Sequence, residues 1–288
     1  MLTIAQQNLF IIGTAYCGST LLGRALNNHG KVGYIGEFSR YEPNYNTYGL
    51  DHRSASCMHC KILQIDCPVF DNKFLSSAQK SKPAKTYDLL RTKLKKPILV
   101  DGSKHPAWLR VVQRQIPKTT TKAIILSRSP VDYLSSCYSR GINPLWPEAN
   151  AWRDVYYDAL RTCNQLNIPY LTVRYEVFTE KPKQTLERIC DFVGIECNKS
   201  MLTKTGPLHA IGGNPGAYVG ALGAGKLQNA VDAQGQSEID INPAHLKSKN
   251  TKLSKAKLAE LQQVAWQTPM LVDVANLLGY GTLCLGMK

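Results

Sequence analysis

Residues 8–37, NLFIIGTAYCGSTLLGRALNNHGKVGYIGE, decide how this chain folds. The segment opens with four apolar residues, 9–12, which have the length and composition of a short strand. A glycine-bounded turn over residues 13–18 follows, and from Ser19 onward the apolar residues recur at helical spacing. A strand, such a loop and a helix start form an anion site, because the loop amides and the first free N–H groups of the helix point at one spot.

The glycine spacing Gly13-x4-Gly18 is that of a phosphate-binding P-loop. In that motif a lysine follows the second glycine, but here Ser19 and then Thr20 follow it. The lysine neutralises the β- and γ-phosphates of a nucleoside triphosphate, so its loss argues against triphosphate hydrolysis. The loop suits a ligand with one phosphate-like group near the helix, and an ordinary strand-turn-helix is the alternative.

The composition is that of a globular protein of 288 residues with 43% hydrophobic residues. No apolar run reaches the 18 or more residues of a membrane-spanning helix, so we expect no membrane span. The apolar run at 9–12 is too short for a signal peptide. Nine cysteines, an odd number, fit a reducing compartment better than a disulfide framework. We therefore expect a soluble, cytoplasmic protein.

The positive charge is concentrated in one part of the chain. Of the net charge of +14, most comes from residues 73–128, which hold 14 Lys and Arg against 2 Asp and Glu. Such a block can be a solvated face, a nucleic-acid patch or a field that gathers an anionic ligand. Its aromatic residues are few (Phe74, Tyr87, Trp108), which gives little for bases to stack on. We expect no nucleic-acid partner.

Strand and helix patterns alternate along most of the chain. Further strands are expected at 31–36, 98–100, 123–126 and 169–173, and helices at 108–115, from Pro130, at 149–166, 183–193, 254–267 and 269–278. This alternation predicts a single three-layer α/β domain over residues 1–288, with a central parallel sheet of about five strands and helices on both faces.

Two segments interrupt the alternation. Residues 40–96 are expected to be a mostly polar, loop-like insert with one helix in its last third. Residues 206–237 are rich in Gly, Ala, Asn and Gln, which predicts a mobile loop.

The insert contains Cys57-x2-Cys60-x6-Cys67, which is part of a structural zinc pattern. The only fourth ligands nearby in the sequence are His52 and His59. The pattern is incomplete, so bound zinc and unligated thiols both remain open.

In parallel α/β sheets, ligands bind beyond the carboxyl ends of the strands. Those ends carry the following residues here: 13–20, Glu37, Lys104 with His105, Arg128 and Tyr175. Phosphate-binding, basic and acidic groups on five strand ends predict one ligand site at this edge.

Four segments resemble the sulfotransferases that use 3′-phosphoadenosine-5′-phosphosulfate (PAPS), and the resemblance runs from about residue 8 to 215. They are TAYCGSTLL (14–22), LSRSPVDYLSSCYS (126–139), PYLTVRYEVFTEKPKQTLERICDFVGI (169–195) and HAIGGNP (209–215). They resemble, in turn, the family's 5′-phosphosulfate loop, its 3′-phosphate motif, its strand-Tyr-Glu-helix unit near the adenosine, and the glycine-rich turn over the 3′-phosphate. The resemblance implies PAPS as donor, 3′,5′-ADP as product and a P-loop-like fold.

The resemblance also assigns cofactor-binding residues. They are Tyr16, Cys17, Gly18, Ser19, Thr20, Arg128, Ser136, Tyr175, Gly213 and Asn214. Arg128 would give the 3′-phosphate a charge-assisted hydrogen bond and Ser136 a hydroxyl. Most relatives carry Arg or Lys at the position of Tyr16, and an Arg often follows the glycine-rich turn, where this chain has Gly216-Ala217. Both departures put the efficiency of transfer in question.

For catalysis, Glu37 is the first candidate for the general base, because several branches of the family use a Glu at this place. His105 is the rival base, since other branches use a His beside a Lys on the third strand. Lys104 would stabilise negative charge on the transferring group. The reaction requires no metal.

The acceptor is expected to be a hydroxyl of a glycan, lipid, phenol, peptide tyrosine or small metabolite. Two other classes stay open. One is a P-loop nucleotide kinase, and the other is a weak or inactive relative that binds PAPS, 3′,5′-ADP or an anionic glycan.

Overall fold

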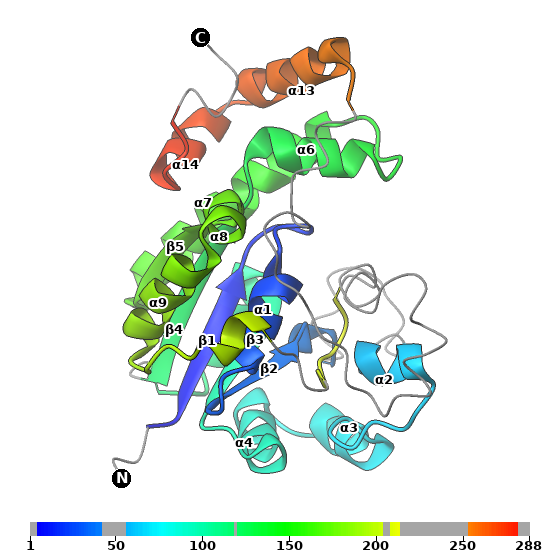
Figure 1. Cartoon of the computed structure of the whole chain (residues 1–288), viewed down its shortest axis with the longest axis vertical. Coiled ribbons are helices and arrows are strands. Elements are labelled where there is room, and N and C mark those ends of the chain that lie inside the picture. The colour runs from blue at the N-terminus through cyan, green and yellow to red at the C-terminus, as the bar shows by residue number, and fades with distance from the viewer. Residues whose placement is uncertain (1–4, 42–55, 118–119, 204–207, 214–252, 282–288) are drawn as a thin grey trace.

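The computed structural model describes residues 5–41, 56–117, 120–203, 208–213 and 253–281. Its strands are β1 (Gln7–Ile12), β2 (Val32–Gly36), β3 (Ile98–Lys104), β4 (Thr121–Ser127) and β5 (Tyr170–Arg174). All pair in parallel, in the order β2-β3-β1-β4-β5 (Figure 1). The predicted five-stranded parallel sheet is therefore confirmed.

The central strand β1 is apolar over residues 9–12, where both faces of the sheet are covered by helices. In β1, Leu9 and Ile11 belong to the core on one face, and Phe10 and Ile12 belong to the core on the other. Side chains alternate between the faces of a strand, so a strand buried on both sides reads as a continuous apolar run. This is why the short run at 9–12 marks the central strand.

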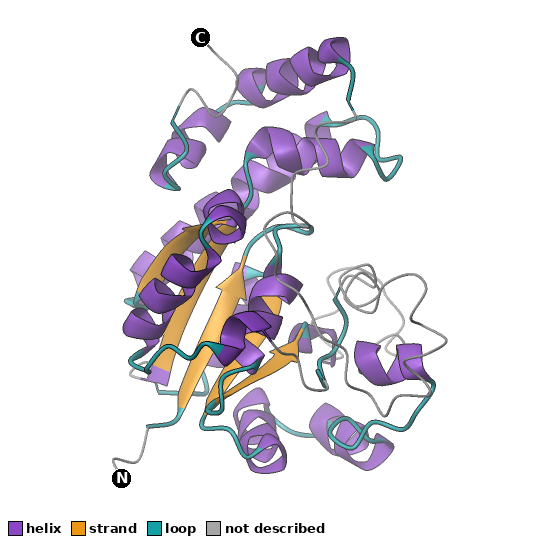
Figure 2. Ribbon diagram, in the orientation of Figure 1, coloured by secondary structure: helices purple, strands orange, loops and turns teal. Residues whose placement is uncertain are grey.

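The helices form the two outer layers (Figure 2). On the face of Leu9 lie α1 (Ser19–Asn27), α8 (Tyr175–Glu180), α9 (Pro182–Val193) and α10 (Ser200–Thr203). On the face of Phe10 lie the 3-10 turn η1 (Phe38–Tyr41), α4 (Pro83–Leu94), α5 (Pro106–Gln113), α6 (Pro130–Tyr138) and α7 (Trp146–Leu166). The C-terminal helices α13 (Lys255–Gln267) and α14 (Leu271–Leu277) add to this second layer beside α6 and α7 (Figure 1).

The insert holds more helix than its composition predicts. Besides α4 it contains α2 (Met58–Leu63) and α3 (Asn72–Gln79). The Asp71 side chain accepts a hydrogen bond from the Phe74 N–H at 2.7 Å and so starts α3, an N-cap signal present in the sequence. Phe70 and Phe74 are buried in the same core as the sheet, so this part of the insert helps to cover the sheet.

Of the segment 206–237, only residues 208–213 lie within the described ranges. They do not form a free loop there, since Ile211 makes a parallel bridge with Gly36 at the end of β2. Residues 206–207 and 214–237 lie outside the described residues. None of the helices in the described ranges has both the length and the apolar character needed to cross a membrane.

Strand order decides where the site lies. β1 is central, with β3 and β2 on one side and β4 and β5 on the other. The chain runs from β1 to the edge strand β2, returns to β3 beside β1, and then crosses to β4 and β5 on the other side. Such a change in the direction of strand order opens a crevice at the carboxyl ends of the strands. The loop after β1 lies at this point.

Candidate functional site

The loop after β1 has a backbone that only certain residues adopt. Tyr16 and Gly18 have φ values of 61° and 93°, in the left-handed region. A Cβ at Gly18 would lie 2.4 Å from Cδ2 of Tyr175, so the ring packs directly on the glycine. The loop leads into the N-terminus of α1, where free N–H groups and the helix dipole favour an anion.

Neighbouring elements hold the loop in place. The Gly13 N–H donates to the carbonyl of Lys104 at 3.1 Å. The Tyr156 hydroxyl accepts from the Thr14 N–H at 3.3 Å and donates to the carbonyl of Leu126 at 2.9 Å. β3, β4 and α7 therefore all fix the start of the loop, so that it is preorganised for a ligand.

Not every side chain of the loop faces outward. Cys17 is fully buried in the core, and burial raises the pKa of its thiol despite hydrogen bonds from Ser19 and the nearby charge of Lys104. Ser19 and Thr20 are also buried, at the start of α1. Cys17 can therefore meet a ligand only through its backbone.

Arg128 and Tyr175, on adjacent strand ends, meet above the loop. The Arg128 guanidinium lies 5.2 Å from the centre of the Tyr175 ring and donates to the Tyr16 carbonyl at 3.5 Å. Trp152 Nε1 donates to the Arg128 carbonyl at 2.9 Å, which fixes the backbone there. Within the described residues the Arg128 Nε is buried without a hydrogen-bond partner, so a donor is left over for an anion.

Glu176 supports this side of the site, and sequence reasoning missed it. Its carboxylate accepts from the Ser129 N–H at 2.8 Å and from the Tyr280 hydroxyl at 2.9 Å. Burial raises the pKa of Glu176, and these hydrogen bonds partly offset the shift. The residue joins β5, the start of α6 and the chain after α14. In the sequence, Glu176 directly follows Tyr175 at a strand end, and this position was the signal that could have identified it.

A second missed residue brings a cation to the loop. The Arg140 guanidinium lies 4.0 Å from the centre of the Tyr16 ring, and its Nη1 donates to the Ser136 carbonyl at 2.7 Å. Ser136 itself is nearly buried on α6. The loop therefore has a positive charge beside it, because the Arg140 guanidinium lies over the face of the Tyr16 ring.

Glu37, Lys104 and Arg40 form a compact charged cluster beside the loop. Glu37 follows β2, and its carboxylate pairs with Lys104 at the end of β3. Its other oxygen accepts from Arg40 Nε at 2.6 Å within η1. The side chains of Glu37 and Lys104 are only 8% and 13% exposed. The sequence predicted that Glu37 and Lys104 share the site, and the structure adds Arg40.

The cluster sets the ionisation of the two candidate bases. Burial alone would raise the pKa of Glu37, but Lys104 and then Arg40 outweigh it and hold that pKa below its ordinary value. Burial lowers the pKa of His105, and the adjacent Lys104 lowers it further. Glu37 is therefore ionised at neutral pH and His105 is uncharged, so each is in the form that accepts a proton.

A buried carboxylate shapes the end of β3. Asp101 accepts from Trp108 Nε1 at 2.9 Å, from the Ser103 N–H at 2.7 Å and from the Tyr87 hydroxyl. Burial raises the pKa of Asp101, and these hydrogen bonds act against that shift. Lys104, three residues on, has a φ of 70°, which is rare for a residue with a side chain. Asp101 thus helps to fix the turn that presents Lys104.

The segment 208–213 borders the cluster. The Glu37 N–H donates to the Ile211 carbonyl at 2.7 Å, and the Ile211 N–H donates to the carbonyl of Ile35 at 3.1 Å. A Cβ at Gly36 would lie 2.2 Å from the Ile211 carbonyl oxygen. Only glycine at this position lets the segment 208–213 come this close to the end of β2.

The glycine-rich turn lies on this side of the site too. Gly212 and Gly213 have φ values of 62° and 95°, and a Cβ at Gly212 would lie 3.0 Å from Arg40 Nε. The turn thus starts next to β2, whereas Arg128 follows β4 on the other side of β1. Asn214 lies outside the described residues.

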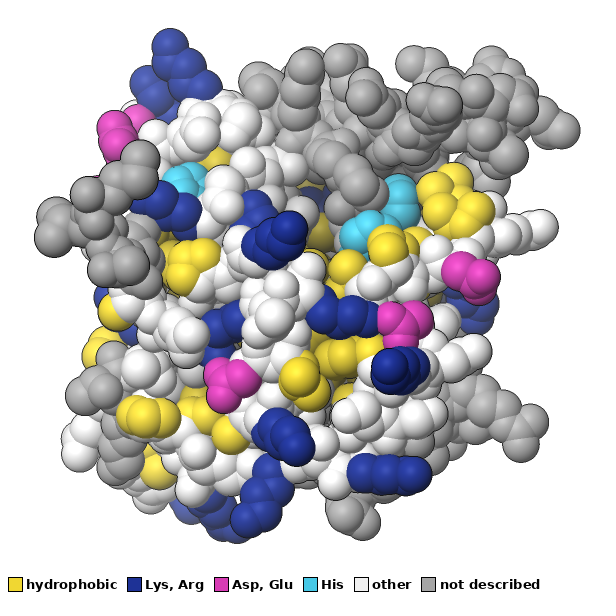
Figure 3. Space-filling model, turned by 90° about the horizontal axis from the view of Figure 1, so that it is seen from below, with side chains coloured by type: hydrophobic (Ala, Val, Ile, Leu, Met, Phe, Trp, Pro, Cys, Tyr) yellow, Lys and Arg dark blue, Asp and Glu magenta, His cyan; other side chains and the backbone are white. Residues whose placement is uncertain are grey.

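The basic block of residues 73–128 is distributed over several elements. Some of its charges are paired, as Lys93 is with Asp71 and Arg110 with Asp158. On the face drawn in Figure 3, Lys and Arg side chains form separate spots among hydrophobic and uncharged surface. In this view the positive charge does not form one continuous patch.

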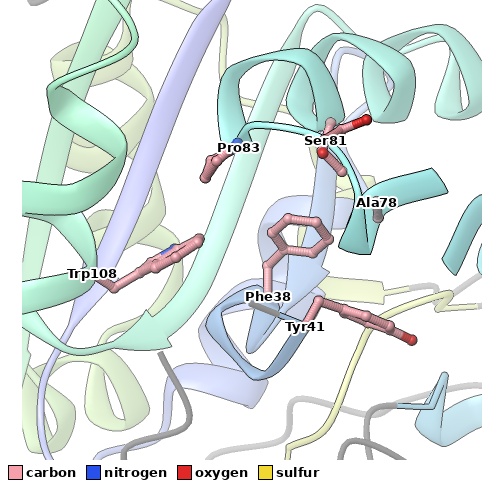
Figure 4. A pocket seen from close by; sticks show the side chains of 7 residues that line it. Phe38, Tyr41, Ala78, Ser81, Pro83 and Trp108 are labelled. Carbon is pink, nitrogen blue, oxygen red and sulfur yellow. The ribbon is translucent and has the colours of Figure 1, made fainter. Parts of the chain in front are cut away.

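A pocket adjoins the cluster. Its lining comes from η1, α4, α5 and the end of α3 and consists of Phe38, Tyr41, Ala78, Ser81, Pro83, Thr86 and Trp108 (Figure 4). Its cavity volume is only about 10 Å³, roughly the space that a single water molecule needs. Phe38 directly follows Glu37, so the pocket lies near the carboxylate, but it is too small to hold an acceptor group.

Comparisons with known proteins bear on the family and the fold of the chain. Residues 8–199 match the model of a sulfotransferase family. The chain is similar in structure to the sulfotransferase domain from the Synechococcus PCC 7002 olefin synthase, with a TM-score of 0.63, 19% identity and coverage of 98% of both chains. It is similar to the sulfotransferase domain from the curacin biosynthetic pathway, with a TM-score of 0.63, 18% identity and coverage of 97% of this chain and 99% of that one. No curated protein sequence matches the chain.

Proposed function

Because the chain belongs to the sulfotransferase family, we propose that it moves a sulfuryl group from PAPS to a hydroxyl of an acceptor. One observation carries the proposal. Five neighbouring strand ends place an anion loop, an arginine with an unused buried donor, and a Glu-Lys pair side by side. That set offers anion binding, charge stabilisation and a proton acceptor at one edge of the sheet.

The residues present fit the donor. The loop amides and the start of α1 would hold the 5′-phosphosulfate, and the Tyr175 ring on Gly18 offers a flat surface for the adenosine end. Arg128 with its unpartnered Nε, and Ser136 on α6, would hold the 3′-phosphate. Tyr16, Cys17, Ser19, Thr20, Gly213 and Asn214 complete the proposed set.

In this proposal the charged cluster of Glu37, Lys104 and Arg40 carries out the chemistry. When bound, PAPS supplies the sulfuryl group, and Lys104 Nζ stabilises the negative charge that develops on it. Glu37 takes the proton of the acceptor hydroxyl as general base. In the ligand-free protein Lys104 and Arg40 hold the Glu37 carboxylate. If Lys104 turned from Glu37 to a bound donor, the loss of that cation would raise the pKa of Glu37 and make it a stronger base. His105 is the alternative base.

The acceptor is a hydroxyl compound that transfer assays must identify. The two similar solved domains come from an olefin synthase and from a biosynthetic pathway, so hydroxylated biosynthetic intermediates belong in the first panel, beside glycans, lipids, phenols and small metabolites. Incubation of a cell extract with PAPS and the protein, followed by mass spectrometry for products heavier by one SO₃ group, tests the proposal. No such product, together with transfer of phosphate from ATP, would point to a kinase.

A second candidate is a relative that binds PAPS or 3′,5′-ADP without transfer. The mutual pairing of Glu37 and Lys104 favours it, since both catalytic groups are occupied by each other. The loop has Tyr16 where most relatives have a cation, and this also favours binding without transfer. Binding of 3′,5′-ADP without transfer of labelled sulfate to any acceptor would select this candidate, and the Tyr16→Arg variant would test whether a loop cation restores transfer.

We expect 3′,5′-ADP to protect the protein against thermal unfolding and ATP to protect it much less. The reason is the separate sites proposed for a 5′ group and a 3′-phosphate, of which ATP can fill only the first. A ligand at one hundred times its dissociation constant adds about 2.7 kcal/mol to the free energy of unfolding. Differential scanning fluorimetry measures the shift, and equal protection by both nucleotides would contradict the assignment.

We expect Arg128→Ala to weaken binding of 3′,5′-ADP by about 1.5–3 kcal/mol, because a charged hydrogen-bond partner of the 3′-phosphate is lost. Calorimetric titration measures the loss, which is roughly 10- to 150-fold in Kd. Adenosine 5′-phosphosulfate lacks the 3′-phosphate and should bind the variant nearly as before. The exposed Arg161 serves for a matched control, Arg161→Ala. An equal loss for both nucleotides would make Arg128 structural.

A further inference from the structure

Three cysteines of the insert meet a histidine from a distant part of the chain. Cys57 is the N-cap of α2, Cys60 lies in its first turn, and Cys67 follows the helix. His209 lies at the start of the segment that pairs with β2. The three Sγ atoms and a ring nitrogen of His209 all lie within 4.8 Å of one another.

The distances from His209 to the three sulfur atoms are close to those of a tetrahedral metal site. His209 Nδ1 lies 3.4 Å from Cys60 Sγ, 3.5 Å from Cys67 Sγ and 3.9 Å from Cys57 Sγ. With Zn–S near 2.3 Å and Zn–N near 2.0–2.1 Å, a regular tetrahedron separates sulfur from nitrogen by about 3.5 Å. The four ligand atoms thus surround a point at which one ion fits.

Backbone pairing, rather than the sequence around the cysteines, delivers the fourth ligand. Cys57 makes an antiparallel bridge with Ile211, and the Met58 N–H donates to the Ala210 carbonyl at 3.0 Å. These contacts set the segment 208–213 beside α2, where the yellow segment lies in Figure 1. His209 therefore reaches the cysteines from outside the insert.

The surroundings of the cluster suit a bound cation. The Phe70 N–H donates to Cys67 Sγ at 3.2 Å, an outer contact of the kind that orients metal-bound thiolates.

We propose that Cys57, Cys60, Cys67 and His209 bind one Zn²⁺ ion as a closed structural site. Three thiolates and one imidazole in tetrahedral array select zinc over the hard, oxygen-preferring cations, and a full set of four protein ligands leaves no open position for catalysis. Of the two histidines that the sequence suggested, His52 lies outside the described residues. His59 is near, with its ring centre 6.0 Å from that of His209, but it is not among the converging ligands.

The site would fasten the insert to the strand that borders Glu37. Ile211, two residues after His209, accepts the Glu37 N–H and pairs with β2. The ion would thus fix the β2 side of the candidate active site without touching the reacting atoms. This inference does not depend on the proposed transfer reaction.

The test begins with the wild-type chain. Purified protein is incubated with ZnCl₂, desalted and analysed by inductively coupled plasma mass spectrometry, and we expect one zinc per chain. Protein loaded with Co²⁺ instead should show the d–d absorption bands of tetrahedral cobalt and a thiolate-to-cobalt charge-transfer band. Zinc-loaded protein should also melt at a higher temperature than chelator-treated protein. Absence of both retained zinc and cobalt bands, or a disulfide among the three cysteines in freshly purified protein, would overturn the proposal.

Matched variants then identify the ligands. His209→Gln and Cys60→Ser should lose the zinc and the cobalt bands. Cys197→Ser, at an exposed cysteine outside the cluster, and His59→Gln, at the neighbouring imidazole, should keep one zinc per chain. Circular dichroism of each variant with and without metal separates loss of binding from loss of fold. Loss of zinc in His59→Gln with full binding in a folded His209→Gln would overturn the assignment of His209.

Discussion

Glu37→Gln is expected to lower turnover about 10²–10⁴-fold with donor affinity nearly unchanged, which is the usual contribution of a general base. The amide keeps the size of the side chain, and its single oxygen can still accept a hydrogen bond from Lys104 or from Arg40, which bond different oxygens of the carboxylate. It cannot take the acceptor proton. Steady-state transfer of labelled sulfate measures turnover, and titration with 3′,5′-ADP measures binding at the donor site.

Two further variants decide between bases. Glu180→Gln, at an exposed glutamate of α8, is the matched control and should keep full turnover. His105→Gln should have a mild effect if Glu37 is the base. A harmless Glu37→Gln change together with a crippling His105→Gln change would move the base to His105. If neither substitution changes turnover, this proposed cluster does not carry the chemistry.

Lys104→Ala is expected to lower turnover about 10²–10³-fold, the typical cost of removing one preorganised group that stabilises transition-state charge. The loss should appear in kcat as well as in kcat/KM, since the interaction strengthens in the transition state. Lys73→Ala, at an exposed lysine of α3, is the matched control for a changed net charge.

The pH profile of kcat/KM gives a second readout for Lys104, because it reports the free enzyme. In wild type the lowered pKa of Glu37 keeps the base ionised, so activity should fall only below about pH 4.3, the ordinary value for glutamate. The Lys104→Ala variant lacks the main cation that lowers the pKa of Glu37, whereas burial still raises that pKa. The pKa of Glu37 should therefore be higher than in wild type, and the acid limb should move to higher pH. An unmoved limb would contradict the coupling between Lys104 and Glu37.

Local patterns were enough to predict the fold. The apolar run at 9–12, the glycine-bounded turn and the alternation of strands with helices predicted the parallel sheet, which the structure confirms. Each of these features depends on residues close together in the chain, where the fixed spacing of helix and strand determines which side chains share a face. For the same reason the strand ends that carry Glu37, Lys104, Arg128 and Tyr175 could be named in advance.

The partners of these residues needed the tertiary structure. Arg140 reaches Tyr16, and His209 reaches Cys60, across separations of more than one hundred residues. No periodicity encodes such a contact, because it depends on strand order and on which segment the edge strand β2 accepts as a neighbour. Arg40 is only three residues from Glu37, yet it meets the carboxylate because η1 turns the chain back at that point.

The sequence by itself thus determined the α/β fold, the loop after the first strand and the edge of the sheet at which the candidate site lies, because these follow from short-range geometry. Only the tertiary structure decided that Glu37 is held by two cations and that His209 lies beside the three cysteines of the insert. Both arise where segments distant in sequence are forced together at the end of β2. There, Gly36 allows the Ile211 backbone to approach closely.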